Sequence, residues 1–372
     1  MKVAVVHEWL TTFAGSEKAL EQILKLFPEA DVFCIVDFLP EPDRGFLEGH
    51  RIKTTFIQKL PFAKRKYRSY LPLMPVAIGM LDLTGYDLVI SSNHAVANGV
   101  KTKSDQLHVS YTYSPMRYAW DLREQYLKES GLDKGLKGFA ARMILSWLKR
   151  WDYRAAQNVD HFICISEYIR KRIKSAYGRD SAVVYPPVDT DFFQPGKNSR
   201  EYYLAASRMV PYKMMPLIVS AFSKMPDRRL VVIGDGPELE RVRQCAGGNI
   251  EILGYQDNFV LKEYLQTAKA LVFAAEEDFG IIPVEAQACG TPVIGYGIGG
   301  LLETVNGLDE SSPTGVLFFE QSIQAIKQAV DKFEQNADRI LPGNCRANAL
   351  NFSEENFRNN FKNYINEILR AA

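Results

Sequence analysis

The sequence predicts an α/β protein of two domains, each built from a parallel sheet with helices between its strands. Short apolar runs such as Lys2–Val6, Tyr86–Ser91 and Thr291–Tyr296 alternate with amphipathic segments, as expected for buried strands and connecting helices. The length of 372 residues exceeds what one hydrophobic core usually supports. A Pro-Pro turn at Pro186–Asp189 separates two series of these runs and marks the domain boundary.

The composition of the chain argues against nucleic-acid binding and against a built-in metal site. With 47% apolar residues, 24% charged residues and a formal net charge of +1, the chain gives no support to a bulk nucleic-acid binder. The cysteines lack metal-type spacing and are predicted to be free thiols, and the five histidines show no paired metal spacing. Neither a secretory signal nor a run of ~20 apolar residues occurs, which predicts a cytoplasmic protein, soluble or peripheral to a membrane. The cysteines are Cys34, Cys164, Cys245, Cys289 and Cys345.

The first strand, Lys2–Val6, leads into a predicted helix that begins near Ser16 and ends at Leu26. The turn at Gly15 points free helix N–H groups toward the carboxyl end of the strand, where ligands of open α/β sheets bind. A capped helix with Ser16 as its N-cap is the structural alternative. The run Asp31–Phe38 is predicted to be the next strand.

Two segments of the first half combine basic and large apolar side chains. Lys59–Leu73 places five basic residues among aromatic residues and leucines, which suits an anionic membrane surface, although a solvated loop explains it equally well. Residues 134–157 are predicted to form a long helix with Lys and Arg on one side and an apolar stripe on the other. Core packing is the usual cause of such a stripe, and docking on a membrane is the alternative. The stripe comprises Phe139, Ile144, Leu145, Trp147 and Trp151.

Polar residues gather at two further loops of the first half. Ser91–Ala95 ends a strand and contains His94; a lone histidine is more often structural, but a strand end favours a ligand site. Ser114–Trp120 follows the strand Leu107–Tyr113, and packing beneath a cleft is one explanation of its aromatic residues. A strand, a basic helix capped by Ser166 and a last strand complete this half: Asp160–Ser166, 167–177 and Ser181–Tyr185.

The second half begins with the strand Tyr202–Ala206, and the loop after it holds Arg208 and Lys213. An Arg fork together with a compact Lys charge suits the clamping of a diphosphate. Gly234–Gly236 follows another strand but lacks the third glycine of a dinucleotide fingerprint. The remaining predicted elements are a strand at Ile250–Gly254, a helix that ends in Tyr264–Lys269, a strand at Thr314–Phe318, a helix at Gln321–Gln335 and a last helix capped by Ser353.

The stretch Phe273–Gly307 organises the second half. An acidic loop, Glu276–Gly280, follows an apolar strand, Pro283 is predicted to be the first residue of a helix, and Gly290 ends that helix. A helix that opens behind a glycine-containing loop at a strand end favours an anion. The acidic side chains there must then bind something else, and sugar hydroxyls are the obvious ligands.

These motifs resemble the signature of retaining glycosyltransferases of the GT-B fold, family 4, in its polysaccharide branch. Seven residues separate Glu277 from Glu285, as in that family, and a Gly-Gly-x-x-Glu element follows at Gly299, Gly300 and Glu303. Ser-Arg-x-Val-Pro-Tyr-Lys, Pro-Met-Arg-Tyr-Ala-Trp-Asp and Pro-Pro-Val-Asp are also similar to family elements. The resemblance implies two Rossmann-like doubly wound domains that face a central cleft, with a C-terminal helix crossing back to the first. The implied ranges are 1–188, 189–352 and 353–372.

The resemblance also implies roles for individual residues. Arg208 and Lys213 would neutralise the donor diphosphate, and Glu285 would accept two ribose hydroxyls. Glu277 would bind the transferred hexose and stabilise positive charge on its ring. His94 joins Glu277, Arg208 and Lys213 as a catalytic candidate. The other donor-binding candidates are Gly15, Gly254, Tyr255, Gly280, Ile281 and Ile282, and the acceptor candidates are Arg117, Tyr118 and Trp120.

The resemblance therefore implies transfer of a hexose from a nucleoside diphosphate sugar to a surface polysaccharide or lipid-linked glycan, with UDP-glucose favoured over GDP-mannose as donor. No cofactor or metal ion is expected, because cations and helix amides neutralise the leaving group. Same-face substitution and double displacement both remain open. The alternatives are a non-catalytic nucleotide-sugar binder or membrane-docked scaffold, and a GT-B nucleotide-sugar epimerase.

Overall fold

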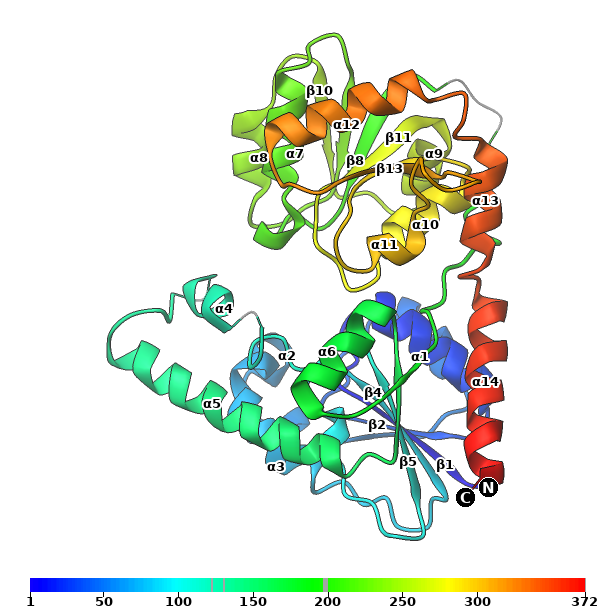
Figure 1. Ribbon diagram of the computed structural model, residues 1–372. Coiled ribbons are helices and arrows are strands. Elements are labelled where there is room, and N and C mark those ends of the chain that lie inside the picture. Colours follow the sequence, from blue (N-terminus) through cyan, green and yellow to red (C-terminus); the bar gives the residue numbers. More distant parts are fainter. Residues whose placement is uncertain (122, 130, 197–199, 372) are drawn as a thin grey trace. The chain divides into compact units, whose positions relative to one another are not determined.

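The computed structural model describes residues 1–121, 123–129, 131–196 and 200–371 (Figure 1). The chain forms two compact units. The first unit contains residues 1–185 together with 358–372, and the second contains residues 186–357. The last helix, α14 (Glu354–Ala371), therefore enters the first unit at Arg358, where Phe361 packs edge-to-face on Tyr111.

The first unit is built on a parallel sheet of seven strands in the order β3-β2-β1-β4-β5-β6-β7. The strand order reverses between β1 and β4, and ligands of such sheets bind beyond the carboxyl ends of the strands at this switch point. The strands are β1 (Val3–His7), β2 (Asp31–Cys34), β3 (Ile52–Thr54), β4 (Leu88–Asn93), β5 (Leu107–Thr112), β6 (His161–Cys164) and β7 (Ala182–Val183).

Helices and 3-10 turns connect these strands. The α-helices are α1 (Gly15–Leu26), α2 (Ala63–Lys66), α3 (Met74–Ile78), α4 (Arg123–Glu129), α5 (Gly135–Gln157) and α6 (Glu167–Tyr177). The 3-10 turns are η1 (Glu41–Asp43), η2 (Gly45–Leu47), η3 (Phe56–Lys59), η4 (Tyr67–Leu73) and η5 (Ala97–Gly99).

The second unit repeats the architecture with a parallel sheet of six strands in the order β10-β9-β8-β11-β12-β13. Its switch point lies between β8 and β11. The strands are β8 (Tyr202–Ala206), β9 (Leu230–Ile233), β10 (Ile250–Gly254), β11 (Ala268–Phe273), β12 (Val293–Tyr296) and β13 (Gly315–Phe318). The helices are η6 (Pro211–Lys213), α7 (Met215–Ser223), α8 (Leu239–Cys245), α9 (Asn258–Thr267), α10 (Ile281–Ala288), α11 (Leu301–Thr304), α12 (Ile323–Gln335) and α13 (Pro342–Leu350).

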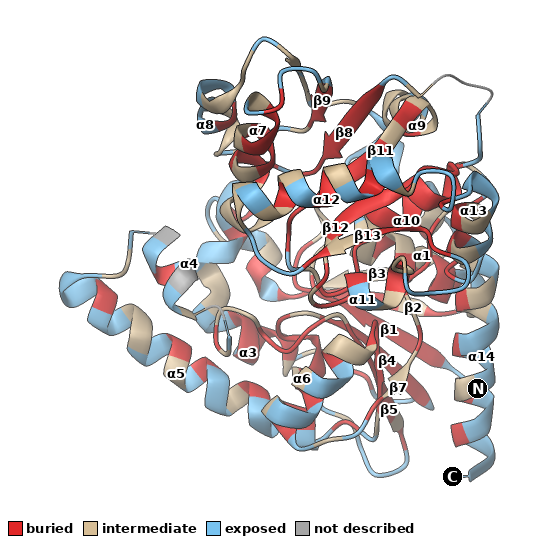
Figure 2. Cartoon of the chain, turned by 45° about the horizontal axis from the view of Figure 1, so that its top comes forward, coloured by how far each residue is buried: buried red, intermediate tan, exposed pale blue. Residues whose placement is uncertain are grey.

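Burial explains why the strands read as continuous apolar runs. Every residue of β1, β4 and β8 is buried, because helices cover both faces of each sheet (Figure 2). The predicted α/β class and doubly wound sheets are confirmed. So are the free cysteines and the caps at Ser166 and Ser353.

Several predicted boundaries are wrong. The strand expected over Asp31–Phe38 ends at Cys34, because its neighbour β1 ends at His7 and the chain beyond is held by loop hydrogen bonds such as Phe38 N–H to Leu10 O. The strand expected over Ser181–Tyr185 contains only Ala182 and Val183. Pro283 is the third residue of α10, not the first. The first four N–H groups of a helix have no partner within the helix, so a proline at this position costs no helical hydrogen bond.

The N-terminus of α1 also differs from the alternative in which Ser16 is the N-cap. The helix begins at Gly15, so Ser16 is inside its first turn. Glu17 reaches back and accepts a hydrogen bond from the Ala14 N–H at 3.0 Å, which satisfies one of the free amides.

Candidate functional site

An ion pair spans the switch point of the second unit. Lys213, in the turn after β8, contacts Glu277, in the acidic loop after β11, and both side chains are largely buried. The Lys213 ammonium also lies 5.6 Å from the centre of the Phe273 ring. Two residues predicted to bind the donor are therefore brought together, although 64 positions separate them in the chain.

The glycine loop is fastened to the backbone of the same acidic loop. Glu277 and Gly299 form a β-bridge, and the Gly300 N–H donates to the Glu277 carbonyl at 2.7 Å. A Cβ on Gly299 would lie 2.4 Å from that carbonyl oxygen, and a Cβ on Gly300 would lie 2.4 Å from the Cα of Phe279. Only glycine permits this approach, so the two glycines hold the Glu277 loop in place.

The helix α10 begins directly after the acidic loop. Gly280 is its N-cap with φ of +90°, a conformation that favours glycine, and the first helical residues are Ile281 and Ile282. Their N–H groups lie in the first turn and give this end of the helix an affinity for anions. Glu285 lies one turn later and is buried, with 4% of its surface exposed.

The loops after β8 and β9 are joined through their backbones. Met209 N–H donates to the Asp235 carbonyl at 2.8 Å, and a Cβ on Gly234 would lie 1.9 Å from the carbonyl oxygen of Ser207. Arg208 lies between these contacts, is exposed, and forms no ion pair with any residue that the structure describes. The remaining base-side candidates end β10: Gly254 has φ of +72°, and Tyr255 is 76% exposed.

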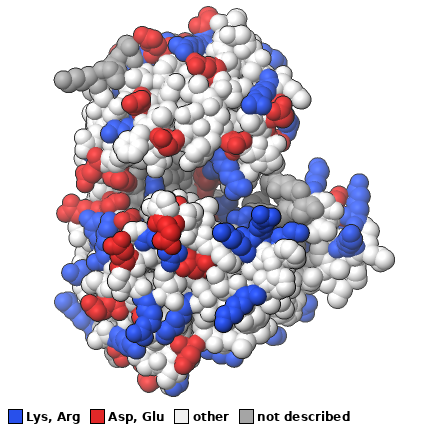
Figure 3. All heavy atoms as spheres, turned by 180° about the vertical axis from the view of Figure 1, so that it is seen from behind, with Lys and Arg blue, Asp and Glu red and all other residues white. Residues whose placement is uncertain are grey.

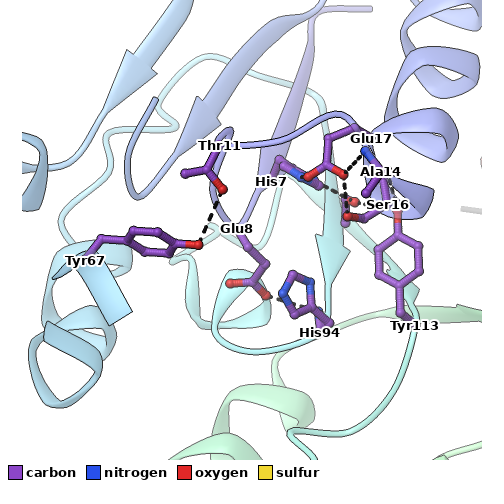
Figure 4. Close-up of polar contacts among 10 residues, drawn as sticks. His7, Glu8, Thr11, Ala14, Ser16, Glu17, Tyr67, His94 and Tyr113 are labelled. Carbon is purple, nitrogen blue, oxygen red and sulfur yellow. Dashed lines mark hydrogen bonds and ion pairs between the residues drawn. The ribbon is translucent and has the colours of Figure 1, made fainter. Parts of the chain in front are cut away.

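The switch point of the first unit is bridged by Glu8. This fully buried residue follows β1, and its carboxylate accepts hydrogen bonds from the backbone N–H groups of residues 94–97 after β4, at 2.7–3.1 Å. The loop that carries His94 is fixed by this arrangement (Figure 4). The His94 ring packs edge-on against Trp9 at 4.8 Å, and burial lowers its pKa, so His94 is neutral at pH 7.

A chain of polar contacts holds the loop that contains Gly15 (Figure 4). Within it, His7 contacts Glu17 through Nε2 at 3.3 Å and Ser92 through Nδ1 at 3.0 Å. Ser92 contacts the hydroxyl of Tyr113, which donates to the Ser16 carbonyl at 3.0 Å. Burial raises the pKa of Glu17, but contacts with His7 and Ser16 outweigh it, so the pKa is lowered.

The acceptor candidates lie on the loop between β5 and α4. Trp120 donates through Nε1 to the Asp152 carboxylate of α5 at 2.8 Å, and Tyr177 of α6 donates to the same oxygen at 2.8 Å. Burial raises the pKa of Asp152 to about 7. Tyr118 keeps its hydroxyl buried without a hydrogen-bond partner in the structure, and Arg117 is partly buried. Much of this loop is thus engaged in packing.

Sequence reasoning missed Glu8, Glu17 and Asp152. Glu8 carried a signal, since an acid two residues after the apolar run Lys2–Val6 stands at a strand end. Glu17 carried a weaker one, three residues after the helix N-cap. Asp152 is the single acid of α5 and looked like a surface charge, because its partners come from distant segments.

The described part of the chain has neither a cluster of metal ligands nor a helix that could span a membrane. No group of three or more His, Cys, Asp or Glu residues there is placed to hold a metal ion. Within the same residues, no helix is both long and apolar enough to cross a membrane.

Solved structures identify the class of fold. The chain is similar to Anabaena HepE in complex with UDP and glucose, at 16% identity, a TM-score of 0.69 and coverage of 98% of this chain and 99% of that one. Sucrose-phosphate synthase from Thermosynechococcus elongatus gives 18% identity and a TM-score of 0.75 with both chains fully covered. The fold is therefore GT-B, as the sequence motifs implied.

Family models identify the group within that class. Glycosyl transferases group 1 matches residues 187–352, and Glycosyltransferase Family 4 matches residues 14–192. The chain belongs to these GT-B glycosyltransferases.

Curated relatives match over only about half of the chain. The GDP-mannose-dependent alpha-(1-6)-phosphatidylinositol monomannoside mannosyltransferase of Mycolicibacterium smegmatis is 31% identical over 212 residues, which cover 48% of this chain and 53% of that protein. The D-inositol 3-phosphate glycosyltransferase of Mycobacterium tuberculosis is 26% identical over 235 residues, covering 55% and 48%. The chain spans about half the length of these relatives.

Proposed function

We propose that this protein is a retaining hexosyltransferase that moves a hexose from a nucleoside diphosphate sugar to a glycan or lipid-linked glycan acceptor. The observation that carries the proposal is the Lys213–Glu277 ion pair at the switch point, beside the first turn of α10. It combines a cation and helix amides for a diphosphate with a carboxylate for sugar hydroxyls. Membership of the glycosyltransferase family supports the same activity.

The reaction breaks the bond between the anomeric carbon and the diphosphate oxygen. The acceptor hydroxyl oxygen bonds to that carbon on the same face, and its proton passes to the departing diphosphate oxygen. Negative charge grows on the leaving group, so Arg208, Lys213 and the N–H groups of Gly280–Ile282 accelerate the step. Glu277 stabilises the positive ring of the hexose, and Glu285 accepts the ribose hydroxyls. No metal ion takes part.

The remaining candidates have supporting roles. Gly254 and Tyr255 bind the base through their backbone. In the first unit, His94 is a catalytic candidate, the Gly15 turn is a donor-binding candidate, and Arg117, Tyr118 and Trp120 are the acceptor candidates. The neutral state of His94 suits contact with sugar hydroxyls, because a neutral imidazole both donates and accepts a hydrogen bond.

Two donors are supported by different observations. UDP-glucose is the donor favoured in the sequence analysis, and the structure of HepE, which has the same fold, is a complex with UDP and glucose. GDP-mannose is the second candidate, because the Mycolicibacterium relative depends on it. That relative is named for a phosphatidylinositol monomannoside, which supports a lipid-carried acceptor. A place at the cytoplasmic face of a membrane, in surface-polysaccharide synthesis, is part of the proposal.

The test compares the two donors directly. Isothermal titration with UDP-glucose and GDP-mannose, each with EDTA, identifies the bound nucleotide, and incubation with membrane lipid extract identifies the glycosylated product and its anomeric configuration. We expect one donor to bind and its sugar to be transferred with retention in the presence of EDTA. Binding without transfer would favour a scaffold. Conversion of the donor to its epimer without an acceptor would favour the epimerase.

A further inference from the structure

The helix α5 exposes a row of large apolar side chains that the core does not use. Leu136 is 90% exposed, Phe139 64%, Met143 59% and Trp147 43%. At 100° per residue these four positions fall on one side of the helix. The stripe was expected to pack in the core, but only Leu145 and part of Trp151 do so, which corrects that prediction for Phe139, Ile144 and Trp147. Figure 1 shows α5 leading away from the sheet, and Figure 2 shows pale exposed residues along it.

Basic residues accompany this row. Lys137, Lys149, Arg150 and Arg154 are exposed on the same helix, and its single acid, Asp152, is buried on the opposite side. Figure 3 shows more Lys and Arg than Asp and Glu over the projecting end of the first unit. A helix with Trp, Phe and Leu beside Lys and Arg has the chemistry that lies in the interface of an anionic bilayer. Charge complementarity thus favours lipid over a second copy of this chain.

The inward side of the same helix holds the loop proposed to bind the acceptor and also the turn that follows His94. Asp152 accepts the hydrogen bond from Trp120 in the loop of residues 113–120. The adjacent Trp151 packs on the turn that follows His94, since a Cβ on Gly99 would lie 2.2 Å from its ring. One turn of α5 therefore fastens both loops to the helix that carries the exposed apolar row.

We propose that α5 docks on an anionic bilayer through Leu136, Phe139, Met143 and Trp147. Asp152 and Trp151 then hold the acceptor loop of residues 113–120 and the turn 97–99 at the lipid surface. Asp152 and Trp151 are positioning residues, which act through Trp120 and the turn 97–99. The inference rests on the proposed function, and it adds that the acceptor enters from the bilayer. Because α5 is a continuous helix, ordering of its outer face by lipid also orders the loops attached to its inner face.

Vesicle sedimentation tests the docking face. We expect the full chain to bind vesicles of phosphatidylglycerol and not of phosphatidylcholine alone. Phe139→Ser with Met143→Ser should weaken binding about tenfold or more, because two exposed apolar side chains lose their burial in the interface. Leu341→Ser with Leu350→Ser, which removes exposed apolar residues from the second unit, is the matched control and should bind like wild type. Equal binding by both double variants, or self-association through this face in light scattering, would overturn the proposal.

Hydrogen exchange tests the coupling to the loops. Phosphatidylglycerol vesicles should slow exchange in residues 93–99 and 113–120 of the wild type. Asp152→Leu removes the acceptor and should abolish the effect in 113–120 while vesicle binding persists. Asp152→Asn keeps a carbonyl oxygen that can accept from both Trp120 and Tyr177, so the slowing of exchange in residues 113–120 should return. If Asp152→Leu does not fold, Trp120→Phe removes the loop's donor alone, and Tyr177→Phe, which leaves the loop's bond intact, is its control.

Unchanged exchange in the wild type, or a vesicle effect that survives Asp152→Leu or Trp120→Phe, would refute the coupling. Neither measurement requires sugar transfer. A wild type that docks and protects its loops but transfers no sugar would therefore refute the proposed function, while the docking face of α5 and its coupling to the loops would stand.

Discussion

Lys213 and Glu277 form an ion pair across the switch point of the second sheet. The proposed function uses both members of the pair, since the ammonium suits the diphosphate and the carboxylate suits the hexose hydroxyls. On this proposal, a bound donor replaces the contact between the two residues with contacts of its own. The first unit bridges its switch point differently, because the Glu8 carboxylate already occupies the backbone amides after β4. The amides that Glu8 holds are therefore not open to an anionic ligand.

Substitutions in this pair separate binding from chemistry. Lys213→Ala is expected to lower kcat/KM by about 30- to 1,000-fold, or ~2–4 kcal/mol, which is the usual effect of removing one donor to a developing anion. It should also weaken binding of the nucleoside diphosphate product. Glu277→Gln leaves Lys213 free, so product binding should be retained or strengthened while kcat falls. Steady-state kinetics and calorimetry measure the two quantities.

Lys224→Ala is the control for Lys213, because this exposed lysine follows α7 in the same unit. We expect wild-type kinetics from it. A Lys213→Ala enzyme with wild-type turnover would remove the central assignment of the proposed function.

The close packing of the glycine loop predicts that a substitution there lowers the free energy of unfolding. Gly300→Ala should destabilise the second unit by about 1–3 kcal/mol, because the added Cβ would lie 2.4 Å from the Cα of Phe279 and its three nearest neighbours are all backbone atoms, which cannot swing aside as a side chain can. The φ of Gly300 is −65°, so the cost is steric and not conformational. Gly343→Ala in α13, where no atom lies within 4 Å of the new Cβ, should be neutral or stabilise by about 0.5 kcal/mol. Urea unfolding compares them, and equal midpoints would contradict the packing argument.

The burial of Asp152 predicts that the stability of the protein depends on pH. Its pKa is raised by burial to about 7, so the folded chain retains a proton that the unfolded chain releases above pH 4. Stability contributed by this group therefore falls as pH rises from about 4 to about 7, by about 1.4 kcal/mol per pH unit at most. Asp152→Asn removes the titration and should be more stable than wild type at pH 8, with the difference vanishing near pH 4. Thermal unfolding across this range measures it, and a pH-independent difference would exclude Asp152 as the cause.

The sequence was most informative where local patterns alone set the structure. Both ends of the strand Tyr202–Ala206 agree with the prediction. A five-residue apolar run between polar segments can be buried in a doubly wound sheet only as a central strand, and the polar segments mark its ends. The acidic and glycine loops after β11 and β12 were found for a similar reason, since glycines and acids at strand ends form a local motif. Boundaries that depend on a neighbouring strand failed, as at Asp31–Phe38, where β1 stops first.

What the sequence determined by itself was the order of elements, the two-sheet class and the chemical character of each loop, because these follow from residue type and spacing. The tertiary structure alone decided which loops meet. Strand order brings Lys213 to Glu277, Glu8 to the amides after β4, and Trp120 to Asp152. It also decided that Phe139 and Trp147 stay exposed, since core packing depends on which helix face meets the sheet and not on the apolar pattern of that helix.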